Sequence, residues 1–204
     1  MIAIVNYGLG NVQAFSNIYK KLGIPHLVAS TADEVRGAER IILPGVGAFD
    51  WAMTRLNESG MREALQESVI GRGTPVLGIC VGMQMLARRS DEGVLDGLGW
   101  IDAEVHRFAD PGPGSPVSLP HMGWNDVTPR ESDGLFRGLD TGARFYFLHS
   151  YYFAPCADRN VLATTDYNGV YASSVRERNV YGVQFHPEKS HQWGIQLLKN
   201  FAGL

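Results

Sequence analysis

Cys80 is one of two cysteines in the 204-residue chain, and it lies between Gly78 and Gly82 in the segment PVLGICVGMQML. The pattern Gly-x-Cys-x-Gly is typical of a nucleophile on a tight turn between a strand and a helix. The first N–H groups of such a helix, with that of Val81 nearest, favour a thiolate and can stabilise an oxyanion beside it. A buried structural cysteine in a glycine-rich turn has the same pattern, so the motif alone leaves both interpretations open.

A catalytic thiol needs a base, and the segment VQFHPEKS contains a candidate. A strand predicted at 180–185 ends next to His186, and Pro187 favours an extended backbone at that histidine. His186 and Glu188 then project to the same side, so the carboxylate can hold the imidazole in one tautomer. A lone histidine beside a proline is usually structural, but His-Pro-Glu after an apolar strand favours a Cys-His-Glu triad.

The segment LPGVGAFD, residues 43–50, is a third candidate element. A strand that ends in Pro-Gly-x-Gly is followed by a loop with unusual backbone freedom. The loop and the Cys80 turn both follow parallel strands, so they can face the same crevice at the carboxyl edge of the sheet. An N–H group of Gly45, Val46 or Gly47 could complete an oxyanion hole, although a plain turn explains the same residues.

The elements that must position these residues follow an α/β pattern. In the first half, strands are predicted at 2–5, 26–29, 40–43 and 76–79, and helices at 12–22 and 61–70. This alternation predicts a parallel sheet with helices on both faces. In the second half, strands are predicted at 100–106, 121–127, 144–153, 161–166, 170–176 and 180–185, with a loop at 111–114, a hairpin turn at 168–169 and a closing helix at 191–201. We therefore expect one domain over residues 1–204, with a mostly parallel central sheet and extra antiparallel strands.

The composition of the chain excludes few functions, but it indicates which classes of binding partner to expect. Hydrophobic residues make up 45% of the chain and charged residues 19%, and the net charge is −3. These values indicate neither a nucleic acid nor a membrane as partner, and no apolar run reaches the roughly 20 residues that span a bilayer. Two cysteines are typical of a cytoplasmic protein, and the first residues resemble a strand more than a targeting leader. No His/Cys cluster has metal-ligand spacing, so we expect neither a metal nor an organic cofactor.

The motifs PGVG, GICVGMQ and HPE, in this order, resemble those of the class I glutamine amidotransferases. The segments NYGLGN, PHMGWN, YFLHSYYF and YGVQFHPEKS are further similar to the glutaminase subunits of imidazole glycerol phosphate synthase, over residues 2–201. The resemblance implies a flavodoxin-like fold and the hydrolysis of glutamine to glutamate and ammonia. It implies that Cys80 is the nucleophile, His186 the base and Glu188 the group that orients the base.

The same resemblance implies a set of residues that bind glutamine. Glu92 would pair with the α-ammonium group, although this carboxylate in RRSDE would otherwise be interpreted as a solvated charge. Gln84 would contact the substrate from the helical face that carries Cys80. The remaining implied substrate-binding residues are Gly45, Val46, Gly47, Val81, His149, Ser150 and Tyr151.

The resemblance also implies a heterodimer with a (β/α)8-barrel cyclase/synthase subunit. Ammonia would pass through a tunnel to this subunit, which converts PRFAR to imidazole glycerol phosphate and AICAR in histidine biosynthesis. Trp124 and Lys189 match positions at the interface, although a core tryptophan and a surface lysine are alternatives. The chain departs from the family pattern at Asn6, where Asp is usual, and at Val81, where Leu is more frequent.

Three other functions are also compatible with these sequence features. A paralogous glutaminase could supply ammonia to a different synthase, for instance in surface-sugar amidation. A flavodoxin-like cysteine hydrolase could use the same thiol on another substrate, and an inactive binding module could keep only the fold. The presence of Cys80, His186 and Glu188 disfavours the last of these.

Overall fold

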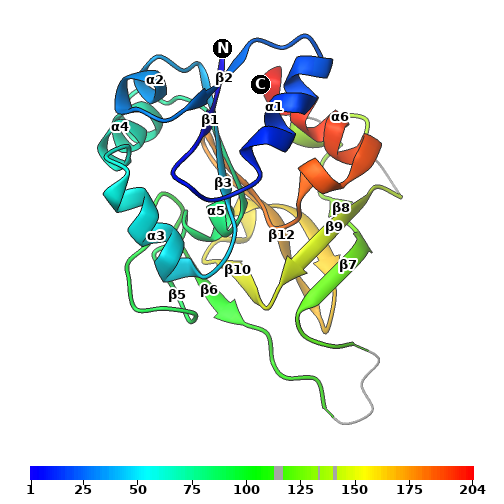
Figure 1. Cartoon of the computed structure of the whole chain (residues 1–204). Helices are drawn as coiled ribbons and strands as arrows, with labels where there is room; N and C mark the ends of the chain where they lie inside the picture. The colour runs from blue at the N-terminus through cyan, green and yellow to red at the C-terminus, as the bar shows by residue number, and fades with distance from the viewer. Residues whose placement is uncertain (113–116, 133, 140–141) are drawn as a thin grey trace.

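A mixed sheet forms the centre of the molecule, in a computed structural model that describes residues 1–112, 117–132, 134–139 and 142–204 (Figure 1). Its parallel half has the strand order β2-β1-β3-β4-β13. These strands are β1 (Ile2–Val5), β2 (His26–Ala29), β3 (Arg40–Gly45), β4 (Val76–Cys80) and β13 (Val180–Val183). Strands β1, β4 and β13 are buried along their whole length, as expected for a parallel sheet covered on both faces.

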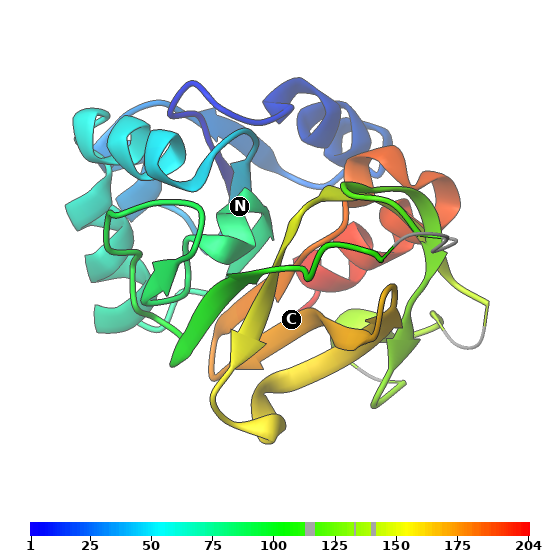
Figure 2. The same ribbon diagram turned by 90° about the horizontal axis from the view of Figure 1, so that it is seen from below.

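Helices cover both faces of this parallel half (Figures 1 and 2). Helices α1 (Val12–Lys21) and α6 (His191–Ala202) lie on one face, where the hydroxyl of Tyr19 donates to the carbonyl of Leu198 at 3.3 Å. The other face carries α2 (Ala32–Arg36), α3 (Phe49–Glu58) and α4 (Arg62–Gln66), the last continued by a π-helical turn at Glu67–Gly71. The predicted α/β architecture is confirmed.

The second half of the chain extends the sheet with mostly antiparallel strands. After β13 the order continues β12-β10-β6-β5, and β11 pairs with β12 and β8. The bounds are β5 (Arg89–Ser90), β6 (Ala103–Arg107), β8 (Thr128–Pro129), β10 (Tyr151–Pro155), β11 (Val161–Asp166) and β12 (Val170–Glu177). Strands β7 (His121–Asp126) and β9 (Arg144–His149) form a separate antiparallel pair. The predicted turn at 168–169 joins β11 to β12, and half of the predicted loop, residues 113–114, lies outside the described residues.

Several strands begin or end at other residues than predicted, and strand pairing explains two of these differences. Strand β3 continues through Pro44, because Pro44 and Gly45 stay in register with Ile79 and Cys80. The strand predicted at 144–153 is broken at Ser150, because β9 pairs with β7 whereas β10 pairs with β6. The strand predicted at 100–106 begins only at β6, and the one predicted at 180–185 ends with β13.

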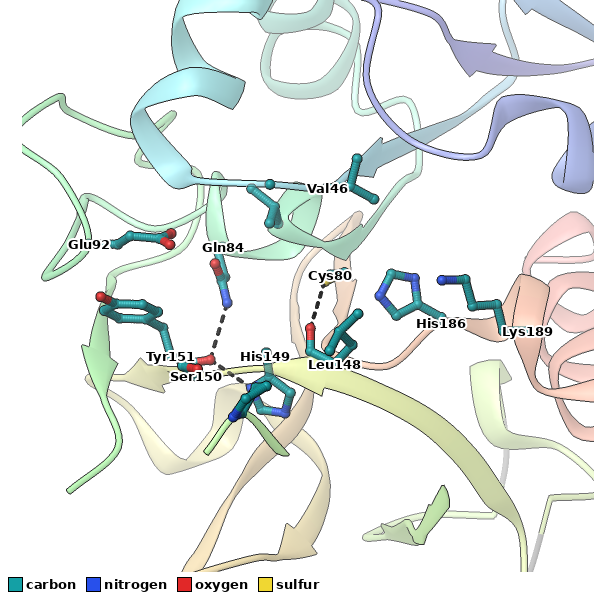
Figure 3. Close-up of a pocket in the computed structure, with 13 residues that line it drawn as sticks. Val46, Cys80, Gln84, Glu92, Leu148, His149, Ser150, Tyr151, His186 and Lys189 are labelled. Atoms are coloured by element: carbon teal, nitrogen blue, oxygen red, sulfur yellow. Dashed lines mark hydrogen bonds between the residues drawn. The ribbon is translucent and has the colours of Figure 1, made fainter. Parts of the chain in front are cut away.

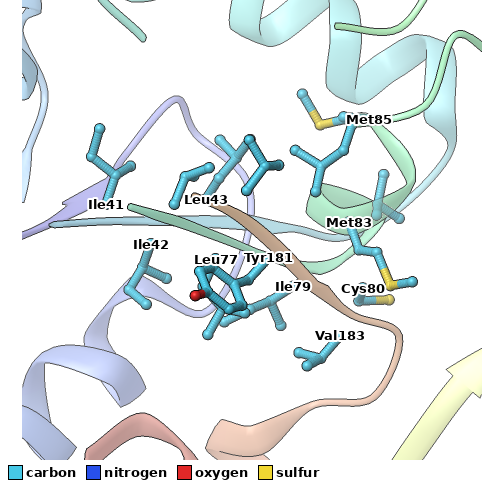
Figure 4. Packing of buried hydrophobic residues seen from close by; sticks show 14 of the residues in the cluster. Ile41, Ile42, Leu43, Leu77, Ile79, Cys80, Met83, Met85, Tyr181 and Val183 are labelled. Carbon is cyan, nitrogen blue, oxygen red and sulfur yellow. The ribbon is translucent and has the colours of Figure 1, made fainter. Parts of the chain in front are cut away.

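The helix after Cys80 is a single turn, α5 (Val81–Gln84). Beyond its end, the carbonyl of Met85 accepts a hydrogen bond from the N–H of Leu98. Figure 4 shows Met83 and Met85 in the same buried cluster as apolar side chains of β3, β4 and β13, such as Leu43, Ile79 and Val183. The turn at Cys80 is therefore held in the core. In the described ranges of the chain, no helix has the length and apolar character needed to cross a membrane.

Candidate active site

Cys80 ends β4 at the carboxyl edge of the parallel strands, and its backbone is strained. It has φ 54° and ψ −114°, which is unusual for a residue other than glycine and costs on the order of 1–3 kcal/mol. The thiol is 4% exposed and lines a cavity (Figure 3). Its sulfur lies 4.0 Å from the carbonyl oxygen of Leu148 and 3.9 Å from Nε2 of Gln184. The chain thus holds the thiol in the sharp turn that the Gly-x-Cys-x-Gly pattern predicts.

Close backbone contacts explain the glycines around this turn. A Cβ on Gly78 would lie 2.6 Å from the carbonyl oxygen of Gly82, and a Cβ on Gly82 would lie 2.0 Å from that of Leu43. Gly45 faces the backbone nitrogen of Gly82, which a Cβ would approach to 2.3 Å. Strands β3 and β4 and helix α5 therefore pack backbone against backbone. Gly45 belongs to this packing and is not among the residues that line the cavity.

His186 and Glu188 form a buried pair beside the thiol. Nδ1 of His186 donates to Oε1 of Glu188 at 2.9 Å, and the two side chains are 4% and 2% exposed. Glu188 reaches the ring from a 3-10 turn, Pro187–Lys189, and not from the extended segment that the sequence predicts. Burial lowers the pKa of His186, but interactions with Cys80 and Glu188 outweigh it and raise this pKa well above that of a free imidazole. The arrangement favours an imidazolium next to the sulfur.

A cavity of about 320 Å³ connects the predicted residues (Figure 3). Of the predicted catalytic and substrate-binding residues, those that line it are Val46, Gly47, Cys80, Val81, Gln84, Glu92, His149, Ser150, Tyr151 and His186. Glu188 is not a lining residue and lies behind the imidazole that it contacts. Lys189, predicted at the interface, also lines the cavity, as do Pro120 and Leu148, which the sequence did not single out. In the described part of the chain, no group of three His, Cys, Asp or Glu side chains could hold a metal ion.

Gln84 holds one wall of the cavity. Its Nε2 donates to the carbonyl oxygen of Tyr151 and to Oε1 of Gln184, both at 3.2 Å. Gln184, the residue after β13, is fully buried and also approaches the Cys80 sulfur, so it links the thiol to this wall. Gln184 was not among the residues predicted from the sequence. A glutamine within the apolar run GVQF is nevertheless a signal, because buried amides need partners.

Glu92 lies on the opposite side of the cavity from the imidazole (Figure 3). Its Oε2 accepts a hydrogen bond from the N–H of Phe49 at 2.9 Å, at the start of α3. Burial raises the pKa of Glu92, the Phe49 N–H opposes this, and the nearby Asp50 carboxylate adds to it. Glu92 is therefore a half-buried carboxylate at the cavity wall and not the fully solvated charge that its sequence context suggests.

Two neighbouring histidines, His149 and His121, belong to a hydrogen-bond network in one wall of the cavity. Nδ1 of His149 donates to the Tyr151 carbonyl at 2.8 Å, so its Nε2 is an acceptor for the hydroxyl of Tyr171 at 3.1 Å. His121 lies 3.2 Å from the same Nε2 and accepts at its own Nε2 from Asn125. Burial lowers the pKa of His121 to about 4 and that of His149 to about 3. The network is complete only when both rings are neutral.

We expect this network to make the protein less stable in acid. Unfolded imidazoles bind protons near pH 6.5 and these folded ones only near pH 3–4, so the free energy of unfolding should fall as pH drops from about 6.5 to 4. Each imidazole can contribute a slope of at most about 1.4 kcal/mol per pH unit. Urea unfolding at several pH values measures it, and His121→Phe should flatten the slope.

His186 does not interfere with this measurement. Its raised pKa adds stability that is complete below about pH 6.5 and is lost at higher pH. The carboxylates titrate alike in both proteins, so the comparison with His121→Phe removes their contribution. Equal slopes in the two proteins would contradict the assignment.

The cavity opens beside an exposed apolar surface on β7 and β9. Met122, Trp124 and Leu148 are 60%, 39% and 39% exposed. The indole of Trp124 stacks on His191 at 5.2 Å between ring centres, and Nζ of Lys189 lies 5.7 Å from the ring centre of Tyr146. Trp124 is therefore a surface residue and does not pack in the core.

The sequence matches one family of known proteins over nearly its whole length. The glutamine amidotransferase class-I family matches residues 4–203. The imidazole glycerol phosphate synthase subunit HisH of Bdellovibrio bacteriovorus is 61% identical over 202 residues, which is 99% of each chain. The subunit of the same name from Leptospira interrogans is 46% identical over 204 residues and covers 100% of both chains.

Solved structures with low identity share the fold. A glutamine amidotransferase crystal structure superposes with a TM-score of 0.71 at 20% identity, covering 100% of this chain and 99% of that one. PurLQS from Thermotoga maritima has a TM-score of 0.71 at 18% identity, with 99% and 97% coverage. The family match and the identity to the HisH subunits both cover nearly the whole chain. The chain therefore belongs to the class-I glutamine amidotransferase family, among its imidazole glycerol phosphate synthase HisH subunits.

Proposed function

We propose that the chain hydrolyses glutamine to glutamate and ammonia and passes the ammonia to a synthase subunit. The single observation that carries this proposal is the Cys80 turn, which presents a thiol to a cavity of about 320 Å³ beside the buried His186–Glu188 pair. The names of the HisH relatives support imidazole glycerol phosphate synthase as the assembly. We place the reaction in the cytoplasm, where a thiol nucleophile stays reduced, and treat residues 1–204 as one catalytic domain.

The reaction begins with the thiolate of Cys80, whose proton is held by His186. The sulfur attacks the side-chain amide carbon of glutamine, and the carbonyl electrons move onto oxygen. When this tetrahedral intermediate collapses, the imidazolium gives its proton to the departing amide nitrogen, and ammonia leaves a γ-glutamyl thioester. Water then attacks the thioester while His186 takes its proton, and glutamate leaves as the thiolate re-forms. Glu188 keeps the hydrogen on Nδ1, so Nε2 is free for each transfer.

The oxyanion would be stabilised by backbone N–H groups on two sides of the thiol. Val81 begins α5 directly after the nucleophile, and Val46 and Gly47 line the same cavity. Gly47 has φ +85°, which lets the loop adopt conformations closed to other residues. We propose that a peptide plane in this loop reorients when the partner binds, so that the isolated chain is a poor glutaminase.

The partner is proposed to be a (β/α)8-barrel synthase that converts PRFAR to imidazole glycerol phosphate and AICAR. The exposed Met122, Trp124 and Leu148, with the Lys189 ammonium beside them, supply an apolar surface with a charged rim next to the cavity. Docking there would place the barrel where ammonia is released.

Glutamate release from glutamine tests the proposed function. It is measured for the chain alone, with the barrel subunit, and with the barrel subunit plus its phosphoribosyl ligand. We expect low, intermediate and high rates in this order. No release under any condition would overturn the glutaminase assignment. Release that only another synthase stimulates would favour a paralogue, and activity on peptides but not glutamine would favour a different cysteine hydrolase.

Glu92→Gln should mainly raise KM for glutamine. If the carboxylate pairs with the α-ammonium, its loss removes a partly desolvated charged contact, and an increase of about tenfold is expected with kcat little changed. The burial-raised pKa of Glu92 gives the sign of a pH effect: protonation at low pH should also raise KM. Steady-state kinetics from neutral pH down to the lowest pH at which the complex is active would show both. A KM equal to that of the wild type at all pH values would exclude this role.

A further inference from the structure

Asp50 and Glu92 lie on two different segments near the cavity, and each carboxylate accepts hydrogen bonds from backbone N–H groups of the other's segment. Glu92, in the loop after β5, accepts from the N–H of Phe49, the first residue of α3. Asp50, the next residue of α3, returns the contact: its carboxylate accepts from the N–H of Val94 at 3.1 and 3.0 Å and from that of Leu95 at 3.1 Å. We call this reciprocal set of bonds the Asp50 clasp.

Gly93 makes room for the clasp. A Cβ at this position would lie 1.9 Å from Oδ1 of Asp50 and 2.3 Å from its Cγ. The backbone of Gly93 is outside the left-handed region, since it is not among the residues with positive φ. The need for glycine at this site therefore arises from the space that the Asp50 carboxylate occupies.

The clasp restrains the carboxylate that faces the substrate. Figure 3 shows Glu92 below the start of α3 with its carboxylate directed into the cavity. One oxygen is held by α3, and the loop that carries Glu92 is held in turn by Asp50. The Asp50 charge also lies close enough to disfavour a second negative charge nearby, and an ammonium group bound to Glu92 would relieve this repulsion.

We propose that Asp50 is a positioning residue that sets the affinity for the α-ammonium of glutamine by holding Glu92. The proposal rests on the proposed glutaminase function and on Glu92 as the ammonium partner. Asp50 itself does not line the cavity, so it acts on binding through Glu92 and not by contact with the substrate.

Asp50→Ala in the assembled complex tests this role. We expect KM for glutamine to rise about five- to tenfold while kcat stays within about twofold, because binding and not chemistry is affected. Asp50→Asn keeps one acceptor oxygen for the Val94 and Leu95 amides, so it should restore most of the affinity. Asp158→Ala is a matched control, since this surface aspartate pairs with Arg130 elsewhere and should leave KM unchanged.

Two double-mutant cycles separate positioning from general damage. Gly93→Ala should raise KM like Asp50→Ala, yet should add little in the Asp50→Ala background, because the clashing carboxylate is gone. Asp50→Ala should also have no further effect in the Glu92→Ala background. Independent effects in either cycle, or a loss of kcat with KM unchanged, would overturn the proposal. A wild-type complex that releases no glutamate would instead overturn the proposed function.

Discussion

Cys80→Ala is expected to abolish glutamine-dependent synthesis while ammonia-dependent synthesis continues. Removal of the nucleophile should lower the glutamine-dependent rate at least about a thousandfold. The substitution keeps the small side chain that the turn tolerates and leaves the partner's site untouched, so folding and docking should survive. Ammonium salts at high pH supply free NH₃, which can enter the synthase site directly. Both rates are measured with the same partner and phosphoribosyl substrate.

The second cysteine provides a matched control for this experiment. Both cysteines are free thiols, but Cys156 is exposed, whereas Cys80 is buried at the cavity. Cys156→Ala should leave both rates unchanged, and a glutamine-like electrophile should label Cys80 alone. If the ammonia-dependent rate fell together with the glutamine-dependent rate, Cys80 would be structural. Continued glutamine-dependent synthesis would show that another group is the nucleophile.

Glu188→Gln is expected to remove the negative charge that stabilises the His186 imidazolium. The amide can accept from Nδ1 through its oxygen, or donate to Nδ1 through its nitrogen and leave the ring hydrogen on Nε2, but neither orientation carries a charge. In the first orientation the imidazolium loses its charged partner, and in the second the imidazole cannot take a proton from the thiol. We expect kcat for glutamine hydrolysis to fall by about 10³- to 10⁴-fold with little change in KM, as for a triad that loses its orienting carboxylate.

This substitution changes the shape of the side chain very little, so a loss of activity would result from the lost charge and the changed hydrogen bonding. Among the described residues, Oε2 of Glu188 has no hydrogen-bond partner, so the isosteric amide mainly alters the contact to His186. Glu104→Gln, in a surface pair with Arg89, is the matched control and should leave kcat unchanged. The nitrogen chemical shifts of the His186 ring report which of its nitrogens carries a proton. Full activity of the variant would contradict the role assigned to Glu188.

Local patterns explain why much of the fold was predictable. Strands β1, β2 and β11 have the predicted bounds, because an apolar run between turn residues needs no distant information to be recognised. Two helices were missed although their signals are present. Thr31 and Glu34 form a capping box at α2, and Phe49, Ala52, Met53 and Leu56 place one apolar face on α3. Both helices could therefore have been predicted from the local sequence.

The sequence by itself determined which family the chain belongs to and which side chains we propose as the catalytic ones. The motif around Cys80 needs glycines at fixed spacing, and His186 and Glu188 are two residues apart, so both patterns are local and readable. Gln84, Glu92 and the segment 149–151 were placed by resemblance, and the structure brings them to one cavity.

Only the tertiary structure decided how those side chains are held. The break at Ser150 depends on which strand each half pairs with, and the backbone contact between Gly45 and Gly82 joins residues 37 positions apart. Gln184 and Asp50 gained their roles from partners on other elements. Local sequence specifies a turn or a helix through dihedral preference and periodicity, whereas these contacts arise only when distant segments pack and their buried polar groups must find partners.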